Sequence, residues 1–251
     1  MFLWQEQALF LGAAAETSLH ASPAIKICVA LSGEFWLKTG AADEWKSFQS
    51  AIIAPGRTHA IDGRRNKIAL IVLVPEAAHA QPLLPILARK SLSRIPAAVV
   101  QNLLPIFAMF DELSGATIES EKICREMLEK LRNADELLSA ALDPRISRGI
   151  ETLRAECEKT LSVGAVAANV ELSESRFSHL FTKEIGVPVR RYQLWLRLRN
   201  AIHLLAGGTS LTELAHEAGF ADSAHLTRTF RQMLGIAPSA LLKHSSLISY
   251  E

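Results

Sequence analysis

The side chains best suited to bind another molecule lie on one predicted helix near the C-terminal end of the sequence. Leu226 and Phe230 stand four residues apart, which predicts the buried face of that helix. The outer face then carries Ser223, Ala224, Thr227 and Arg228. A guanidinium can bond the edge of a guanine or a phosphate, and short hydroxyls can bond either donors or acceptors. Together these side chains predict contact with the major groove of double-stranded DNA.

A second set of the same kind occurs earlier in the chain. Val163 aligns with Leu211 at an offset of 48 residues, and Phe177 aligns with Leu226 at an offset of 49. The difference of one residue falls in the turn between the helices, where insertions are best tolerated. The outer face of the earlier helix carries Ser175, Arg176, Ser178 and His179. The sequence therefore contains two copies of one helix-turn-helix unit, Leu161–Pro188 and Leu211–Pro238.

The segment between the two copies predicts a single long helix over Val189–Leu205. A helix of that length spans roughly 25 Å at about 1.5 Å per residue. Such a rod can hold two reading helices about one DNA turn apart, or ~34 Å. Residues 176–205 hold six basic residues and a single acid, Glu184; the basic residues are Arg176, Lys183, Arg190, Arg191, Arg197 and Arg199. They form either a stripe that faces DNA phosphates or an ordinary solvated helix face.

The order and spacing of these residues resemble the AraC family of transcription regulators. The matching motifs are Leu172-Ser173, Phe177-Ser178-His179-Leu180-Phe181, Gly186-Val187-Pro188, Leu196-x-Leu198-x-x-Ala201, Ala215-x-x-Ala218-Gly219-Phe220 and Leu226-x-Arg228-x-Phe230-Arg231. The sequence departs from the family after Pro238, where an aromatic residue and an Arg are usual. The resemblance implies a bacterial DNA-binding regulator that works with RNA polymerase. Asp143-Pro144, a cap followed by a first-turn proline, predicts that this domain covers 143–251.

The first part of the sequence, 1–142, predicts a small antiparallel barrel followed by helices, so the fold class of the chain is α+β. The predicted strands are Ile25–Leu31, Gly33–Leu37, Gln49–Ala54, Thr58–Ile61 and Lys67–Val74. The segment Ile52–His59 resembles the second half-motif of a cupin barrel. In AraC relatives such a barrel binds a small effector, which implies a small organic effector here.

Three residues of this barrel are candidates for effector binding: Trp36, Arg57 and His59. Phe35 and Trp36 alternate across a strand, so one of them points inward, as core or as pocket lining. Arg57 faces either the cavity or solvent, and solvent is favoured. A metal-binding cupin needs further histidines on an earlier strand pair, but His20 lies upstream and alone. We therefore expect no metal and no cofactor.

Helical spacing predicts three helices after the barrel, Pro82–Arg89, Pro96–Leu113 and Glu119–Leu131. Two of them carry apolar stripes, one formed by Leu103, Ile106, Phe107 and Phe110 and the other by Ile123, Met127, Leu128 and Leu131. Each stripe can pack against the barrel or against a second subunit. Because together they offer more apolar area than one small barrel face covers, we expect a homodimer.

Composition and charge argue against several classes of protein. No apolar run reaches the ~18 residues of a membrane span, no signal peptide begins the sequence, and three scattered cysteines fit a cytoplasmic protein with reduced thiols. The net charge of +1 argues against a non-specific architectural DNA binder. The prediction is a sequence-specific DNA-binding transcription regulator that responds to a small molecule and is not an enzyme. The alternative is a cupin-type metal enzyme fused to a DNA-binding module.

Overall fold

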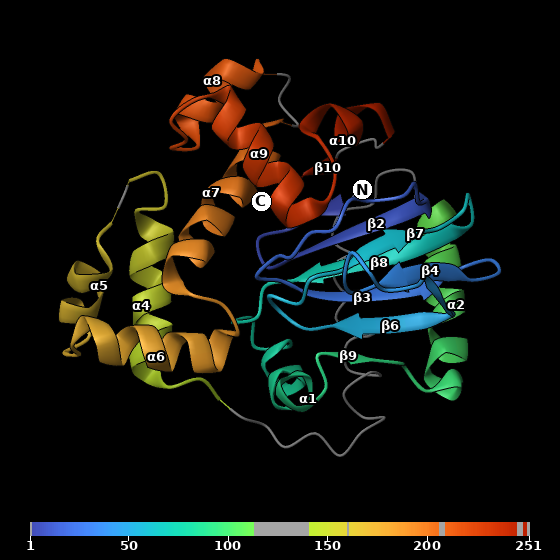
Figure 1. The fold of residues 1–251 in the computed structure, drawn as a ribbon, viewed down its shortest axis with the longest axis horizontal. Coiled ribbons are helices and arrows are strands. Elements are labelled where there is room, and N and C mark those ends of the chain that lie inside the picture. The colour runs from blue at the N-terminus through green and yellow to red at the C-terminus, as the bar shows by residue number, and fades with distance from the viewer. Residues whose placement is uncertain (1, 113–140, 160, 206–208, 245–247, 250–251) are drawn as a thin grey trace.

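The computed structural model describes residues 2–112, 141–159, 161–205, 209–244 and 248–249. It is an α+β fold in which a β-sheet half, from the first part of the chain, lies beside a helical half, from the last part (Figure 1). The α+β prediction is confirmed. Among the described helices, none combines the length and the hydropathy that crossing a bilayer requires.

The strands form two separate hydrogen-bonded sheets. The larger sheet has the order β10-β1-β2-β8-β3-β6-β9, with β1 and β10 parallel and the other neighbours antiparallel. Its strands are β1 (Phe2–Leu3), β2 (Gln7–Ala13), β3 (Ile25–Ala30), β6 (Ser50–Ile53), β8 (Lys67–Leu73), β9 (Leu92–Ser93) and β10 (Ile248–Ser249). The smaller sheet has the order β5-β4-β7, formed by Lys46–Phe48, Phe35–Lys38 and Ala60–Asp62. A bridge between His20 and His59 lies outside these strands.

All five predicted strands exist. Of the strands that the sequence did not predict, β1, β2, β5 and β9 lack β-branched residues, and β10 is only two residues long. β2 contains three alanine and glycine residues among seven, and β5 is only three residues long. Strand propensity is low for such segments, and their pairing partners lie far along the chain. β2 pairs with β8 over its whole length, from Gln7 opposite Leu73 to Ala13 opposite Lys67.

The central strand β3 is buried on both faces. Ile25, Ile27 and Val29 belong to a core that includes residues of helix α2 (Ala97–Glu112), whereas Cys28 packs with the smaller sheet. Side chains alternate along a strand, so Lys26 points to the same side as Cys28, away from α2. The strand therefore presents a lysine on a face that the rest of the fold covers.

The first of the two apolar stripes is core. Leu103 and Phe107 on α2 are almost fully buried against the sheet, with Ile106 beside them. The short helices η1 (Gln81–Leu83) and α1 (Leu84–Arg89) precede α2. The Phe110 side chain and the predicted helix Glu119–Leu131, with its stripe, lie outside the described residues.

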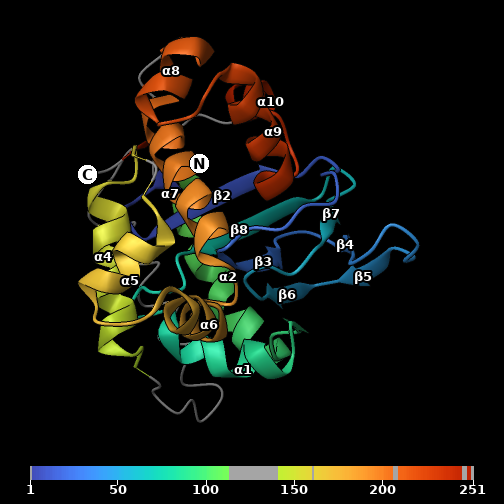
Figure 2. The same cartoon turned by 60° about the vertical axis from the view of Figure 1, so that its left-hand side comes forward.

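The helical half follows the predicted duplication. Its helices are α4 (Pro144–Ala155), α5 (Val163–Asn169), α6 (Glu174–Ile185), α7 (Val189–Leu205), α8 (Leu211–Glu217), α9 (Ser223–Leu234) and α10 (Pro238–His244). Side chains cap five N-termini, and the capping residues are Asp143, Ser162, Ser173, Ser210 and Asp222. α5–α6 and α8–α9 lie at opposite ends of α7 (Figures 1 and 2).

Both copies end their second helix on a left-handed glycine that touches the sheet half. Gly186 follows α6 with φ +85°, and a Cβ built there would lie 3.2 Å from Pro55 Cβ. Gly235 follows α9 with φ +75°, and a Cβ there would lie 2.8 Å from the Ser18 carbonyl and overlap the His20 ring. Glycine is needed at both caps, but only at Gly235 does the neighbouring chain leave no room for a methyl group.

These two glycines give a matched test of the contact. Gly235→Ala and Gly186→Ala should each lower the free energy of unfolding by roughly 1–2 kcal/mol, the cost of a left-handed backbone for an L-residue. Gly235→Ala should cost more, because the methyl group must also displace the 17–20 segment. Urea unfolding of both variants measures the difference, and equal losses would show that the sheet half yields freely at Gly235.

Candidate nucleic-acid interface and internal cavity

The structure places the predicted DNA-reading side chains on open faces of α6 and α9. Phe177, Phe181, Leu226 and Phe230 are fully buried, as predicted for the opposite faces. Ser175, Arg176, His179, Ala224 and Arg228 are exposed, and Ser178, Ser223 and Thr227 are half-buried. All eight candidates are thus accessible at least in part, and their contact with DNA stays a prediction.

The predicted basic stripe is wrong for half of its members. Arg197 is buried and donates to the backbone carbonyls of Cys157 and Lys159 at 3.0 and 2.9 Å. Arg191 donates to the Ala21 carbonyl at 2.6 Å, and Arg199 lines an internal cavity. α7 is surrounded by other elements, so Arg191 and Arg197 turn inward and satisfy backbone carbonyls. Arg176, Lys183 and Arg190 remain exposed.

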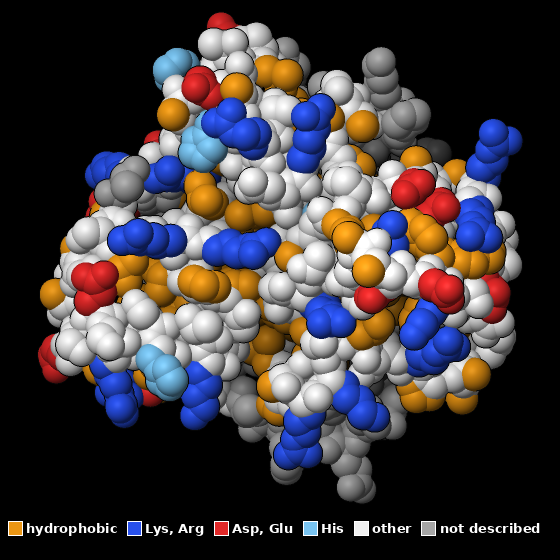
Figure 3. Space-filling view, viewed as in Figure 1, with side chains coloured by type: hydrophobic (Ala, Val, Ile, Leu, Met, Phe, Trp, Pro, Cys, Tyr) orange, Lys and Arg blue, Asp and Glu red, His pale blue; other side chains and the backbone are white. Residues whose placement is uncertain are grey.

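The two reading helices are not parallel to each other in this structure. α6 and α9 run in clearly different directions in both Figure 1 and Figure 2. Lys and Arg side chains are spread over the helical half of the face in Figure 3 rather than gathered into one band. Insertion of both helices into successive major grooves of straight DNA therefore calls for a rearrangement of one unit or a bend in the DNA.

The second unit is tied to the sheet half through the segment that precedes β3. The Ser18 amide and hydroxyl donate to the Gly235 carbonyl at 2.9 and 3.0 Å, and the Ala21 amide donates to the Gln232 carbonyl at 3.0 Å. A second link joins the sheet half to α4 and to the first turn of α7. There Glu76 accepts hydrogen bonds from Tyr192 and from Arg154, the latter at 2.6 Å. Burial, with Glu76 next in effect, raises the pKa of Tyr192, so this phenol stays protonated and donates.

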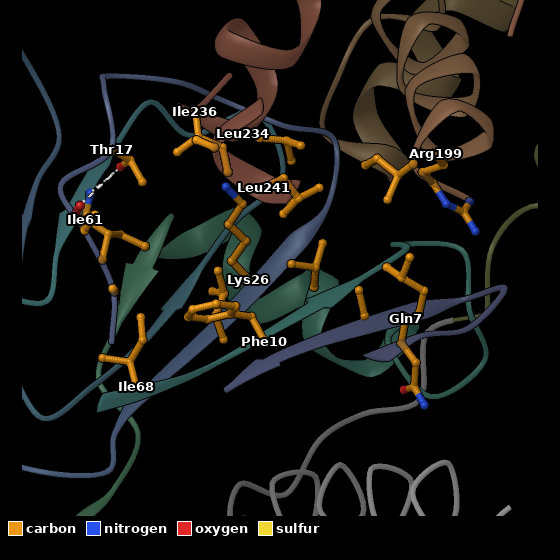
Figure 4. A pocket seen from close by; sticks show the side chains of 18 of the residues that line it. Gln7, Phe10, Thr17, Lys26, Ile61, Ile68, Arg199, Leu234, Ile236 and Leu241 are labelled. Carbon is orange, nitrogen blue, oxygen red and sulfur yellow. Dashed lines mark hydrogen bonds between the residues drawn. The ribbon is translucent and has the colours of Figure 1, made fainter. Parts of the chain in front are cut away.

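A cavity of about 340 Å³ lies between the two halves (Figure 4). Its wall is mostly apolar and is formed by β1, β2, β3 and β8 on one side and by α7, α9 and α10 on the other; it includes Phe10, Leu70, Ile202, Ile236 and Leu241. Lys26, Arg199 and His203 are the basic side chains of this wall, and Glu16 is an acidic one. Trp195 also lines it, and the buried Trp195 Nε1 has no hydrogen-bond partner within the described part of the chain. The volume and the apolar lining suit a small organic ligand.

At one wall of the cavity Lys26 is held between two histidines. Lys26 Nζ lies 2.5 Å from His20 Nε2 and 3.2 Å from His59 Nε2, and the two rings are 4.2 Å apart. All three side chains are buried. Burial lowers the pKa of Lys26 to about 7. Burial and the nearby Lys26 lower the pKa values of His20 and His59 to about 3 and about 2, so both rings are neutral.

This cluster corrects one expectation and bears on three candidate residues. His20 is not alone, because the backbone bridge to His59 brings it across from a distant part of the sequence. Phe35 points inward, and Arg57 is exposed as favoured. Trp36 is half-buried under the Arg64 guanidinium, 4.0 Å from the ring centroid. Trp36, Arg57 and His59 are not among the residues that line the cavity, and their role in effector binding stays untested.

Known proteins match the helical half by sequence. The family model described as "Helix-turn-helix domain" matches residues 166–244. The HTH-type transcriptional regulator YidL of Escherichia coli K12 is 36% identical over 102 residues, and the arabinose operon regulatory protein of the same strain is 26% identical over 115. These matches cover 40% and 45% of this chain and 34% and 39% of the two relatives, so the chain spans well under half of their length.

The chain is thus similar, over its helical half, to AraC-type transcription regulators. Its overall fold is also similar to a solved one: apo ToxT from Vibrio cholerae superposes with a TM-score of 0.68 over 96% of this chain and 98% of that protein, at 12% identity. At that identity the likeness concerns the fold alone. It covers the sheet half as well as the AraC-type domain, and so extends beyond the region matched by sequence.

The neutral histidines of the cluster predict a pH dependence of stability. Both histidines have folded pKa values far below the ordinary value of 6.5, so the unfolded chain binds more protons as pH falls. The free energy of unfolding should decline below about pH 6.5, by up to ~1.4 kcal/mol per pH unit for each histidine. The groups that act on them are Lys26, which is protonated below its pKa of about 7, and, for His59, also His20 and Arg57.

Urea unfolding between about pH 6.5 and 5 checks this expectation, since most carboxylates titrate lower. His20→Gln keeps an oxygen acceptor for Lys26 but cannot take up a proton. Its slope with pH should therefore be shallower than that of the wild-type protein by one histidine's contribution, up to ~1.4 kcal/mol per pH unit. An unchanged slope would mean that His20 is protonated in the folded protein.

Proposed function

We propose that this protein is a sequence-specific DNA-binding transcription regulator whose DNA affinity changes when a small molecule occupies the cavity between its halves. The observation that carries the proposal is the duplicated helix-turn-helix unit with two exposed reading faces. The relatives matched by sequence are themselves regulators. We propose no catalytic activity, and we expect the protein to act in the cytoplasm, where its DNA lies.

The two units read DNA in different ways. α9 carries Arg228, whose guanidinium can bond a guanine or a phosphate. α6 carries Ser175, Ser178 and His179, short groups that discriminate less between bases. The N-termini of both helices and the exposed Arg176 contact phosphates and fix the register. We therefore expect sequence preference to reside mainly under α9.

Arg228→Ala tests this assignment against Arg231→Ala, which removes the same charge from an exposed position one turn away on the same helix. The preferred duplex is first selected from random sequences. Arg228→Ala should weaken binding to it by about 1–3 kcal/mol, or roughly 5- to 150-fold, and weaken binding to a scrambled duplex much less. Arg231→Ala should affect both duplexes equally and mildly.

Titration of both variants by fluorescence anisotropy at one fixed salt concentration measures these effects. An equal loss on both duplexes would make Arg228 a phosphate contact. Unchanged affinity of the Arg228 variant on both would remove α9 from the interface.

The cavity supports an effector that controls the second unit. One of the ToxT crystal structures is described as bound to an unsaturated fatty acid, and we extend the idea of a small, largely apolar effector to this chain. Residues from α7, α9 and α10 form one side of the cavity, and strands form the other. An occupant therefore touches both halves and changes the energy of the contact that holds α9 against the 17–22 segment.

We further propose two working units, 1–142 for effector sensing and dimerisation and 143–251 for DNA binding and contact with RNA polymerase. The stripe on α2 is occupied by the sheet core, so dimer contact falls to the predicted stripe of Ile123, Met127, Leu128 and Leu131, outside the described residues. A homodimer also doubles the DNA contacts without a large net charge on one chain.

Sedimentation of the full chain at micromolar concentration should show a dimer. Leu128→Glu should shift the population to monomer, because it places a carboxylate within an apolar contact. Gln101→Glu, on the exposed face of α2, introduces the same charge and should leave the dimer intact. A wild-type monomer, or a dimer that persists in the Leu128 variant, would contradict this arrangement.

A further inference from the structure

The Lys26 side chain is an unusual group for the wall of an apolar cavity. It rises from β3 and carries its nitrogen toward Leu234, Ile236 and Leu241 (Figure 4). Only 3% of the residue is exposed. Within the described residues the amine has two hydrogen-bond partners, His20 Nε2 and His59 Nε2, and neither is an acid.

The hydrogen bonds of the two histidines determine the protonation of the cluster. His20 Nδ1 lies 2.8 Å from the Ser18 carbonyl, and His59 Nδ1 lies 2.8 Å from the Arg57 carbonyl. A carbonyl only accepts, so each Nδ1 carries the ring hydrogen and each Nε2 is an acceptor. Both Nε2 atoms therefore accept from the lysine.

A neutral amine fits this arrangement and an ammonium does not. The neutral amine donates its two hydrogens to the two Nε2 atoms and keeps its lone pair. An ammonium has a third N–H, for which the described residues provide no further acceptor. Burial also lowers the pKa of Lys26 to about 7, so a large share of the amine is unprotonated at neutral pH. A desolvated neutral lysine is a nucleophile.

We infer that Lys26 is a covalent attachment site, at which the amine forms an imine with the carbonyl carbon of an apolar aldehyde bound in the cavity. This inference rests on the proposed function in one respect, namely that the aldehyde serves as the effector. The cavity of about 340 Å³ accommodates the aliphatic chain against residues such as Phe10, Leu70 and Ile202.

The chemistry balances without an oxidant or a reductant. The Nζ lone pair attacks the carbonyl carbon, the C–N bond forms, and the C=O π pair moves to oxygen. One amine hydrogen passes to that oxygen by way of a histidine Nε2, which gives the carbinolamine. The carbinolamine then loses its hydroxyl with the second amine hydrogen, so that one water leaves and the C=N bond remains. Both hydrogens that held the histidines are now in the water.

The loss of the two Lys26 amine hydrogens couples imine formation in the cavity to the affinity for DNA. His20 and His59 lose their shared donor and must find other partners. The His20 ring lies where a Cβ of Gly235 would be, and Ser18, which accepts from His20, donates to the Gly235 carbonyl. A change in His20 therefore reaches the end of α9 directly. Imine formation should alter the affinity for the selected duplex by about 5- to 150-fold, the usual range of coupling between two sites.

Reductive trapping of the full-length protein tests the inference. Decanal and sodium cyanoborohydride are added at neutral pH, and peptide mapping by mass spectrometry locates the alkyl group. Lys26 should be alkylated at least ten times more than the half-exposed Lys38 or the exposed Lys67. Lys26→Met, which keeps a similar apolar volume, should abolish that label. The wild-type map alone decides the site if the variant does not fold.

Decanoic acid serves as a non-covalent probe of the same cavity, followed by thermal unfolding and by affinity for the selected duplex. Label at Lys26 together with a changed DNA affinity supports the inference. Label confined to surface lysines, with decanoic acid still raising the melting temperature and changing DNA affinity, overturns the imine but keeps an effector cavity. If neither compound changes melting or DNA affinity, the proposed effector role fails as well.

Discussion

The contact between the 17–22 segment and the end of α9 is the constraint on which the rest of the arrangement depends. Backbone groups make it: the Ser18 amide bonds the Gly235 carbonyl, and the Ala21 amide bonds the Gln232 carbonyl. The approach is possible because Gly235 has no side chain. Once this segment is docked, His20 faces His59, β3 lies beneath, and the space left between the halves becomes a cavity lined by both.

The two helix-turn-helix copies also contact the sheet half in equivalent ways. Each copy ends its reading helix with a left-handed glycine, and each glycine meets a different loop of the sheet half. The Gly186 end rests on the Pro55–Gly56 turn, whereas the Gly235 end rests on the segment before β3. Because two different loops receive equivalent ends, the sheet half fixes the relative direction of α6 and α9. A ligand that alters one loop contact therefore shifts one unit relative to the other.

Local patterns in the sequence were sufficient for most of the described helices, for the caps Asp143 and Asp222, and for five of the ten described strands. Asp222, Gly235 and the Leu226–Phe230 pair act within a few residues of one another, so their meaning is readable without a fold. The positions of Arg197 and His20 depend on partners far away in sequence, Cys157 and His59. No spacing rule connects such pairs. The inward arginines and the Lys26 cluster were for that reason beyond prediction, although a lone lysine within the apolar run of β3 was a visible signal.

Burying a lysine at this position costs folding free energy, which calls for a functional reason. A methionine or leucine at this register would fill the same space without the desolvation of an amine and two imidazoles. β3 could not relieve the cost by a shift of one residue, because Ile25 and Ile27 would then leave the core that they share with α2. The strand is held in register by β6 and β8 on either side, with Lys26 opposite Ile53 and Val72. Packing thus fixes the amine in the cavity wall, and the two histidines keep it uncharged there.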